Sequence, residues 1–308
     1  MSAVSTVNPS RIEALRAQRG RRLPNLRLRS EAEAESFINE VGFCYLFAAR
    51  GFAMPTLWEA ICGDDRPLPQ HHDDEALGRA WDWKDSLPAR KACYYGKLLR
   101  KTPTLVSLSF LPCFYALSQN YGDENDYLQE YQEGRLSAEA KWVFEALLRN
   151  GPQSTTRLRK LAGLDGKANV LRFDRALTEL QAGLKIVKVG ISDANAWGYC
   201  YVYDLLLRQY PDLAERARAI SSVQAEDALC LKYLETAVCI PQEEVGRLFS
   251  WEPWRVDRLI ARLQGTGALQ KDLIWPGRRG PHLARSEDLP AILSNSLSQR
   301  AQSVDSAG

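Results

Sequence analysis

"KANVLRFDRALTELQAGLKIVKVGIS", residues 167–192, changes its hydrophobic period near Gly183. Before this glycine, apolar residues recur at spacings of three and four, which is the period of one helix face. After it, apolar and polar residues alternate, and a turn at 193–198 leads into a second alternating run at 199–205. Alternation of this kind is typical of β-strands. The sequence therefore predicts a helix that runs directly into a β-hairpin.

Two further helices are predicted before this stretch. SAEAKWVFEALLRNG (137–151) opens on Ser137 as an N-cap and ends at Gly151, and STTRLRKLAGL (154–164) supplies the second helix. Three helices followed by a hairpin is the order of a winged helix, whose third helix lies in a DNA major groove while the hairpin reaches the neighbouring backbone. We therefore predict a winged helix at 136–205.

The same pattern recurs nearer the C-terminus. Its predicted elements are helices at 225–237, 241–251 and 252–267, a strand at 268–275 and an Arg/Gly turn at 276–281. Two copies of one supersecondary plan indicate a tandem array. We predict a further winged helix at 223–290, which a linking helix at 206–222 joins to the preceding one.

The N-terminal part is less regular. Capped helices at 30–43 and 56–63 begin a predicted first winged-helix-like domain, with inserted helices, at 30–120. Within it, AWDWKDSLPARKACYYGKLLRK (80–101) mixes aromatic residues with cations, and its second half, 88–101, is predicted to be helical.

The two ends of the chain are predicted to be unstructured. Residues 1–29 contain seven arginines against one acid, Glu13, which indicates a flexible basic arm that adds non-specific backbone charge on DNA. A solvated tail without function is the alternative interpretation of this arm. The polar segment 297–308 is expected to be disordered.

Composition sets the class of the protein. The 308 residues are 45% apolar with a net charge of +2, as in ordinary globular proteins. The seven cysteines lack the close spacing of a zinc site, so we expect buried free thiols in a reducing compartment. There is no signal peptide, and the apolar run at 105–117 is too short to cross a bilayer. We expect a soluble, cytoplasmic monomer without cofactor, metal or membrane partner, mainly α with small β-hairpins, built from tandem winged-helix (helix-turn-helix) domains.

Arginines recur at matching places on the two predicted third helices. Guanidinium forks suit phosphates and guanine edges, so rows that face solvent are what docking on double-stranded DNA requires. A solvated helix face is the alternative for either row alone. Further cations lie in the second predicted wing and in the 88–101 segment. The predicted DNA-binding residues are Arg172, Arg175, Arg255, Arg258, Arg262, Arg278, Arg279, Lys97 and Lys101.

Templates for catalysis are mostly missing. There is no Gly-rich phosphate loop, HExxH motif or nucleophile elbow, and the adjacent residues of QHHDDE (70–75) are not expected to converge on a metal ion. In the 80–101 stretch, Trp83 or Tyr94 could stack on a displaced base, and Asp82 or Asp85 could activate water. The alternative is that Trp81, Tyr94 and Leu98 pack the first domain while the lysines reach solvent.

Several phrases resemble the tandem winged-helix family of bacterial alkylpurine and interstrand-crosslink DNA glycosylases, the AlkZ/YcaQ type, and more closely an AlkZ-related branch of it. The phrases are VGFCYLF (41–47), PTLWEAICG (55–63), WDWKDSLPARKACYYGKLL (81–99) and the three-helix unit at 137–205. The resemblance covers roughly residues 30–285. It implies three winged helices that embrace duplex DNA, damaged DNA included, in DNA repair, with the first contributing the site.

One segment departs from this family. The resemblance places a Gln-hydrophobic-Gln or Gln-hydrophobic-Asp motif after the helix at 30–43, yet this chain reads GFCYLFAARG (42–51), without Gln, Asp or Glu. No catalytic residue is therefore carried over, and the sequence predicts a DNA-binding protein that is not an enzyme.

Two alternatives remain open. An active glycosylase would hydrolyse the N-glycosidic bond of alkylated or crosslinked bases by means of Asp82 or Asp85. A protein-interaction module of winged helices would instead pair its arginine rows with acids of its own fold.

Overall fold

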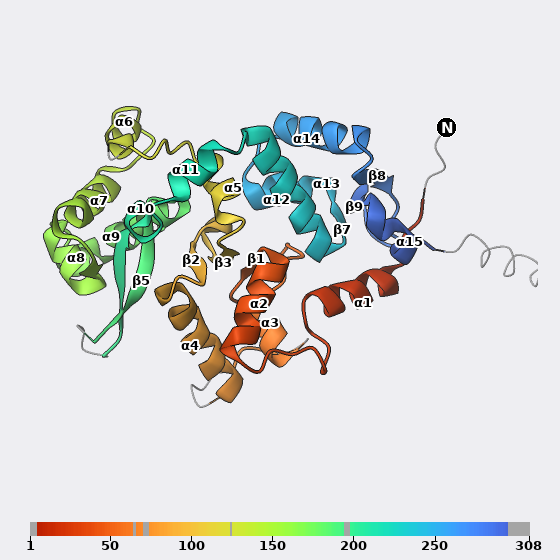
Figure 1. The fold of residues 1–308 in the computed structure, drawn as a ribbon, viewed down its shortest axis with the longest axis horizontal. Coiled ribbons are helices and arrows are strands. Elements are labelled where there is room, and N and C mark those ends of the chain that lie inside the picture. Colours follow the sequence, from red (N-terminus) through yellow and green to blue (C-terminus); the bar gives the residue numbers. More distant parts are fainter. Residues whose placement is uncertain (1–4, 64–65, 70–73, 124, 194–197, 295–308) are drawn as a thin grey trace, which may run out of the picture.

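The computed structural model describes residues 5–63, 66–69, 74–123, 125–193 and 198–294. Three units of the same element order follow one another along the chain: helix, strand, helix, helix, strand, strand. In Figure 1 the second unit lies at the left, the third at the upper right and the helices of the first below the centre. The sequence predicted three helices followed by a hairpin in the second and third units, but not the short strand after each first helix; the first unit has the same element order.

The bounds of the elements are as follows. The first unit comprises α2 (Glu31–Val41), β1 (Phe43–Tyr45), α3 (Leu57–Cys62), α4 (Glu75–Ala89), β2 (Cys93–Lys97) and β3 (Pro103–Ser107). The second comprises α7 (Ala138–Asn150), β4 (Gln153–Ser154), α8 (Thr155–Leu161), α9 (Val170–Ala182), β5 (Ile186–Ser192) and β6 (Cys200–Leu205). The third comprises α12 (Ser222–Ala237), β7 (Cys239–Pro241), α13 (Gln242–Phe249), α14 (Pro253–Gly265), β8 (Leu269–Leu273) and β9 (His282–Arg285).

Each unit closes with a small antiparallel sheet in which the last strand lies in the middle. The strand orders are β1-β3-β2, β4-β6-β5 and β7-β9-β8. The short first strand pairs at Cys44↔Leu105 in the first unit and at Ile240↔Leu283 in the third. Because the short strand follows the first helix directly, each sheet ties the beginning of its unit to its end.

Local signals explain where the first helix of each unit begins. Ser30, Ser137 and Ser221 each accept a hydrogen bond from a backbone N–H of the first turn, and the caps at Ser30 and Ser221 are complete capping boxes. Such caps satisfy donors that have no partner within the helix. The second of these caps was predicted from the sequence and is confirmed.

One apolar cluster joins the three units. Phe43 of β1 packs edge-on against Phe114 of α5 (Leu111–Ala116) at 5.3 Å and against Phe249 of α13 at 6.1 Å between ring centroids. Leu184 and Val187 of the second unit belong to the same buried cluster. Since the cluster is continuous, the units cannot rotate independently without exposing apolar surface to water.

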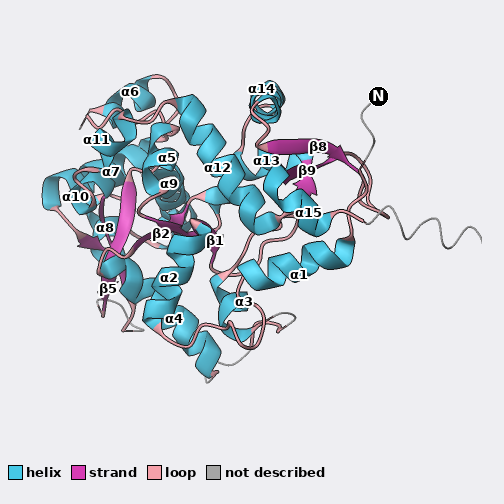
Figure 2. Cartoon of the chain, turned by 45° about the vertical axis from the view of Figure 1, so that its right-hand side comes forward, coloured by secondary structure: helices cyan, strands magenta, loops and turns pink. Residues whose placement is uncertain are grey.

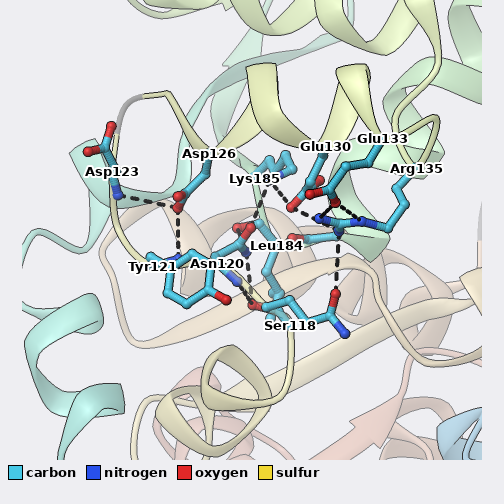
Figure 3. A network of polar contacts seen from close by, with 12 residues as sticks. Ser118, Asn120, Tyr121, Asp123, Asp126, Glu130, Glu133, Arg135, Leu184 and Lys185 are labelled. Carbon is cyan, nitrogen blue, oxygen red and sulfur yellow. Dashed lines mark hydrogen bonds and ion pairs between the residues drawn. The ribbon is translucent and has the colours of Figure 1, made fainter.

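The segment between the first two units is fixed by a polar network (Figure 3). A carboxylate oxygen of Asp126, at the start of α6 (Asp126–Gln132), accepts hydrogen bonds from the backbone N–H groups of Tyr121, Gly122 and Asp123 at 2.8, 2.9 and 3.2 Å. The network continues through buried Lys185, whose ammonium group donates to Asn120 and Glu130 at 2.7 and 3.0 Å. This segment is thus bound to the second unit by charge-assisted hydrogen bonds.

The N-terminal segment is folded, so the prediction of a flexible arm at 1–29 is wrong for the residues described. Residues 9–19 form α1 (Pro9–Arg19), which packs against α12 and α15 (Leu289–Ile292) (Figure 2). Ile12 is fully buried, Arg19 lies 2.5 Å from Asp288, and Arg16 donates to the carbonyl of Ala237 at 2.8 Å. Two of the arginines that suggested DNA contact are therefore held inside the fold, Arg16 by the carbonyl end of α12 and Arg19 by Asp288.

The helix predicted at 88–101 is also wrong. Helix α4 ends at Ala89, and the chain enters strand β2, where Tyr94 pairs with Val106 and Tyr95 with Leu105. The adjacent aromatic residues point to opposite faces of the strand, and both are buried. The predicted linking helix at 206–222 is two short helices, α10 (Leu206–Gln209) and α11 (Leu213–Arg218).

All seven cysteines are free and buried, as predicted. The predicted disordered tail at 297–308 lies outside the described residues.

We predict that Asp126→Ala lowers the free energy of unfolding by about 1–3 kcal/mol, because three backbone donors lose a charged acceptor. Asp165→Ala, at an exposed aspartate, is the matched control and should change stability by less than about 0.5 kcal/mol. Urea denaturation of both variants measures the difference. Equal stability of the two variants would show that the network does not fix this segment.

Candidate nucleic-acid interface

The predicted arginine row of the second unit is partly occupied by an acid of the same unit. Arg172 on α9 lies 2.5 Å from a carboxylate oxygen of Glu139 on α7. The hydrogen bond from Arg172 lowers the pKa of Glu139. Arg175, one turn further along α9, is exposed, and no described carboxylate forms an ion pair with it.

In the predicted row of the third unit, two of the arginines also form ion pairs with acids of the same unit. Arg255 on α14 lies 2.6 Å from Glu226, and Arg262 lies 2.6 Å from Asp227, both acids of α12. Arg258 instead lies over the ring of exposed Trp254, 5.9 Å from its centroid. The predicted rows are therefore only partly solvent-facing, because Arg172 is paired but exposed while Arg255 and Arg262 are paired and half-buried; contact of these residues with DNA stays a prediction. Their acid partners come from a different helix, so helical periodicity alone could not reveal the pairing.

The arginines of the second predicted wing differ from each other. Arg278 lies over the ring of Trp275, 4.1 Å from its centroid, and is exposed. Arg279 is exposed as well. Neither forms an ion pair with a described carboxylate, so both remain able to contact a phosphate.

A second group of cations lies at the junction of the three units. The turn η1 (Leu99–Lys101) follows β2, and its two cations, Arg100 and Lys101, both have left-handed backbone conformations, with φ of 53° and 57°. Two consecutive non-glycine residues in this region carry a conformational cost. The buried Thr104 hydroxyl helps to hold the turn by accepting from the Leu99 N–H at 3.3 Å.

Neighbouring units extend this group on both sides. On one side, the ammonium group of Lys97 lies 3.3 Å from the hydroxyl of Thr178, one turn after Arg175 on α9. On the other, the Arg100 guanidinium donates to Ser250 at 3.0 Å, at the end of α13. Arg247, on the same helix, donates to the carbonyl of Gly51 at 3.3 Å, next to exposed Arg50. We call this group the basic strip; it consists of Arg50, Lys97, Arg100, Lys101, Arg175 and Arg247.

The basic strip has little acid nearby. Glu244 lies 3.9 Å from Arg247, but it is buried and accepts hydrogen bonds from the Ala53 N–H, at 2.9 Å, and from the hydroxyl of Tyr233. The Glu244 carboxylate is therefore engaged mainly by these hydrogen bonds inside the fold. The sequence predicted Lys97, Lys101 and Arg175 as DNA contacts but missed the other three members. Their assembly depends on how the units are packed, for which the sequence carries no local signal.

The two predicted base-stacking residues lie in the core. Tyr94 is fully buried, and its hydroxyl donates to the backbone carbonyl of Gln181 at 3.2 Å. Trp83 is buried in the cluster between α2, α3 and α4. A base needs an exposed ring face for stacking, so this prediction is wrong for both residues. The alternative of core packing is right for Tyr94 but not for Trp81, which is 40% exposed, and Lys84 is buried instead of reaching solvent.

The two predicted catalytic aspartates line one hollow of about 690 Å³ between α4 and the β5–β6 hairpin. Asp82 is exposed. Asp85 accepts hydrogen bonds from the ammonium group of Lys84 and from the hydroxyl of Tyr199, both at 2.8 Å. Lys84 also donates to the Tyr199 hydroxyl at 2.8 Å, so the three side chains form a closed triangle.

A second buried lysine lies beside this triangle. The ammonium nitrogen of Lys188, on β5, lies 3.8 Å from the ring centroid of Tyr201 and 4.3 Å from that of Tyr95. The side chain is 8% exposed, and no described residue forms a hydrogen bond or ion pair with it. Burial, and then the nearby Lys84 charge, lower the pKa of Lys188 to about 7. No pattern in the sequence predicted that Lys188 is buried.

The segment in which the resemblance places the catalytic motif contains β1 and the loop that follows. Tyr45, in this segment, is fully buried, its hydroxyl has no hydrogen-bond partner among the described residues, and burial raises its pKa to about 12. Phe47 packs near Trp58 and Trp81, with centroids 6.1 and 6.4 Å away. These side chains build core rather than a water-activating site.

The described residues show neither a metal-ion cluster nor a membrane-spanning helix. They contain no group of three or more His, Cys, Asp or Glu side chains placed to hold a metal ion, and His71 and His72 lie outside them. None of the described helices has both the length and the apolar content needed to cross a membrane.

Comparisons with known proteins agree with this architecture. The family model described as "AlkZ related" matches residues 28–250. Among solved structures, the Streptomyces sahachiroi DNA glycosylase AlkZ is similar, with a TM-score of 0.56 and 13% sequence identity, over 92% of this chain and 71% of that chain. No curated protein matches the chain. At this identity, the structural likeness shows a shared fold.

We predict that Lys188→Met stabilises the protein at pH 7 and that the gain disappears near pH 10. Because the folded-state pKa of Lys188 is below that of the unfolded chain, the unfolded chain binds the extra proton between about pH 7 and 10.5. Wild-type stability should therefore rise with pH in this window, by at most roughly 1.4 kcal/mol per unit.

Thermal unfolding at several pH values measures this effect, with Lys160→Met, at an exposed lysine, as the control. A Lys188→Met profile parallel to that of wild type would show that the amine titrates normally.

Proposed function

Because the chain belongs to the AlkZ-related family, we propose that it is a DNA-binding protein that engages duplex DNA along the basic strip. Each of its three units is a winged helix in this proposal. The support is the element order shared by the units, together with strand orders in which the last strand is central.

The charge distribution is the observation that carries the proposal. The cations of the basic strip come from all three units, and most have no acid partner among the described residues. Arginine and lysine side chains that are free of carboxylates can neutralise phosphates and release counterions. The apolar cluster that holds Phe43 also holds the units in fixed positions, so these charges form a preorganised surface.

The proposed activity is binding without N-glycosidic hydrolysis. Residues 43–51 contain no carboxylate or side-chain amide to position water, and Tyr45 is sealed in the core. The structure also gives one observation that favours an interaction module, since Arg172, Arg255 and Arg262 pair with acids of their own units. The basic strip is what distinguishes the two functions, because its one ion pair among the described residues joins Arg247 to buried Glu244, 3.9 Å away.

The binding prediction concerns a triple variant of the strip, Arg100→Ala/Lys101→Ala/Arg175→Ala. We expect it to bind a duplex roughly 10- to 100-fold more weakly and to lower the slope of log K against log salt by about 2–3, one for each lost phosphate contact. Fluorescence anisotropy over a salt series measures both quantities.

The control removes three arginines that pair with an acid four residues earlier, exposed Arg149 and Arg216 and half-buried Arg79, as Arg79→Ala/Arg149→Ala/Arg216→Ala. It loses the same formal charge but should keep most of the affinity. Equal losses of duplex affinity in both variants would show that the basic strip contributes no more to binding than positive charge elsewhere on the surface. Absence of duplex binding by the wild type would favour the interaction module.

A separate prediction concerns catalysis. Incubation with alkylated and crosslinked duplexes should release no base and leave no abasic site. Base release that is lost in Asp85→Asn or Asp82→Asn would instead establish the glycosylase, with water activation in the hollow beside α4.

A further inference from the structure

We propose that a pocket at the junction of the three units binds a small amphipathic anion, a molecule with an apolar body and a carboxylate, sulfonate or phosphate group at one end. The bound anion also excludes DNA from two cations of the basic strip. This second part rests on the proposed function, whereas binding of the anion does not.

The pocket has a volume of about 560 Å³ and lies where the three units meet. Its lining comes from residues 98–101 of the first unit, Ala182 and Leu184 of the second, residues 248–251 of the third, and Phe114 on α5. Pockets that bind drug-sized molecules have volumes of about 300–1,000 Å³. The junction therefore has room for one small molecule.

The walls of the pocket are apolar and fixed in place. Phe114, Leu229 and Leu248 line it, are buried, and belong to the apolar cluster that joins the units. Phe249 and Trp251 stack on each other in the same lining, with ring centroids 4.5 Å apart and planes at 18°. Because the cluster holds these side chains, the pocket is formed before a ligand enters, and an apolar body that fills it is removed from water.

Two cations lie at the rim of the pocket. Arg100 and Lys101 line it from η1, both are exposed, and neither forms an ion pair with a described carboxylate. The hydrogen bond from Arg100 to Ser250, which also lines the pocket, holds the guanidinium group at the rim. Left-handed conformations such as those of Arg100 and Lys101 persist where surrounding contacts impose them, and they are frequent at ligand sites. The turn thus presents two positive charges beside an apolar pocket.

The charge of the lining determines which ligand fits. No Asp or Glu is among the described residues that line this pocket, whereas Asp82 and Asp85 line the hollow beside α4. A cationic ligand would be repelled by η1, and a neutral one would displace water from both cations without replacing its hydrogen bonds. An anionic group accepts charge-assisted hydrogen bonds from Arg100 and Lys101 while its body fills the pocket. An amphipathic anion is therefore the class of ligand that matches both parts of the site.

The same two cations belong to the basic strip. A bound anion occupies the donors of Arg100 and Lys101 that contact phosphates in the proposed complex with DNA. The anion and the duplex therefore compete, and each weakens the binding of the other by the same factor.

The first test titrates two fluorescent dyes into the full chain without DNA, the anion 8-anilinonaphthalene-1-sulfonate and its uncharged analogue N-phenyl-1-naphthylamine. The wild type should bind the anion at one saturable site. Arg100→Ala/Lys101→Ala should bind the anion roughly tenfold more weakly, because two charged donors are lost, but keep its affinity for the analogue. Ala182→Phe should bind both dyes roughly tenfold more weakly, because the added ring fills the pocket.

The matched controls are Arg149→Ala/Lys160→Ala, which removes two exposed cations outside the lining, and Ala138→Phe, which adds a ring on α7. Both should bind the two dyes as the wild type does, and circular dichroism checks that each variant is folded. Failure of the wild type to bind the anion, an equal loss of both dyes in Arg100→Ala/Lys101→Ala, or unchanged binding in folded Ala182→Phe would overturn the proposed site. The double variant changes only exposed side chains, so it decides the question even if Ala182→Phe does not fold.

The second test measures the anisotropy of a labelled duplex with and without saturating 8-anilinonaphthalene-1-sulfonate. The dye should weaken duplex binding by the wild type roughly fivefold or more, because it occupies two phosphate-binding cations, and should not affect Ala182→Phe. Equal duplex affinity with and without the dye would overturn the competition and leave the proposed function standing. Absence of duplex binding by the wild type would overturn the proposed function and the competition, while the dye titration without DNA would still decide the pocket.

Discussion

The packing of Phe43 between α5 and α13 is the constraint on which the rest of the structure depends. Its ring contacts those of Phe114 and Phe249, and the same cluster extends to Leu184 and Val187 of the second unit. The first two units also have apolar clusters of their own, but the first strand of the first unit inserts Phe43 into a core shared by all three. The relative positions of the units are thereby fixed, and cations from different units become one surface.

In the second and third units, acids of the first helix pair with arginines of the third helix. The first helix of a unit supplies acids that anchor the third helix, Glu139 to Arg172 and Glu226 to Arg255. These pairs fix helix orientation and neutralise part of the charge on α9 and α14. Cations without a described carboxylate partner lie at the junction, where η1 presents Arg100, and between β8 and β9, at Arg278 and Arg279. The hairpin of the second unit is occupied as well, because Tyr199 joins it to Asp85 of α4.

Much of the fold could be predicted from the sequence where local signals decide it. The serine cap at Ser137 and the period change at Gly183 predicted the start of α7 and the passage from α9 to β5, and the recurrence near the C-terminus predicted helices that match α12, α13 and α14. The errors occurred where tertiary contacts decide. The run around Tyr94 has helical spacing, yet pairing with β3 makes it a strand, and the arginines of α1 find carbonyl and carboxylate partners far along the chain. The candidate site was least predictable from the sequence. Neither the left-handed turn at Arg100 and Lys101 nor the burial of Lys188 produces a recognisable pattern in a short stretch of residues.

Lysine acetylation footprinting with and without a duplex tests the central claim most directly. If the junction of the three units is the DNA surface, Lys97 and Lys101 should lose reactivity in the complex, while Lys160 on α8 and Lys271 on β8 keep theirs. Protection of Lys160 and Lys271 with unchanged reactivity at Lys97 and Lys101 would contradict the account, because DNA would then lie on the outer faces of separate units.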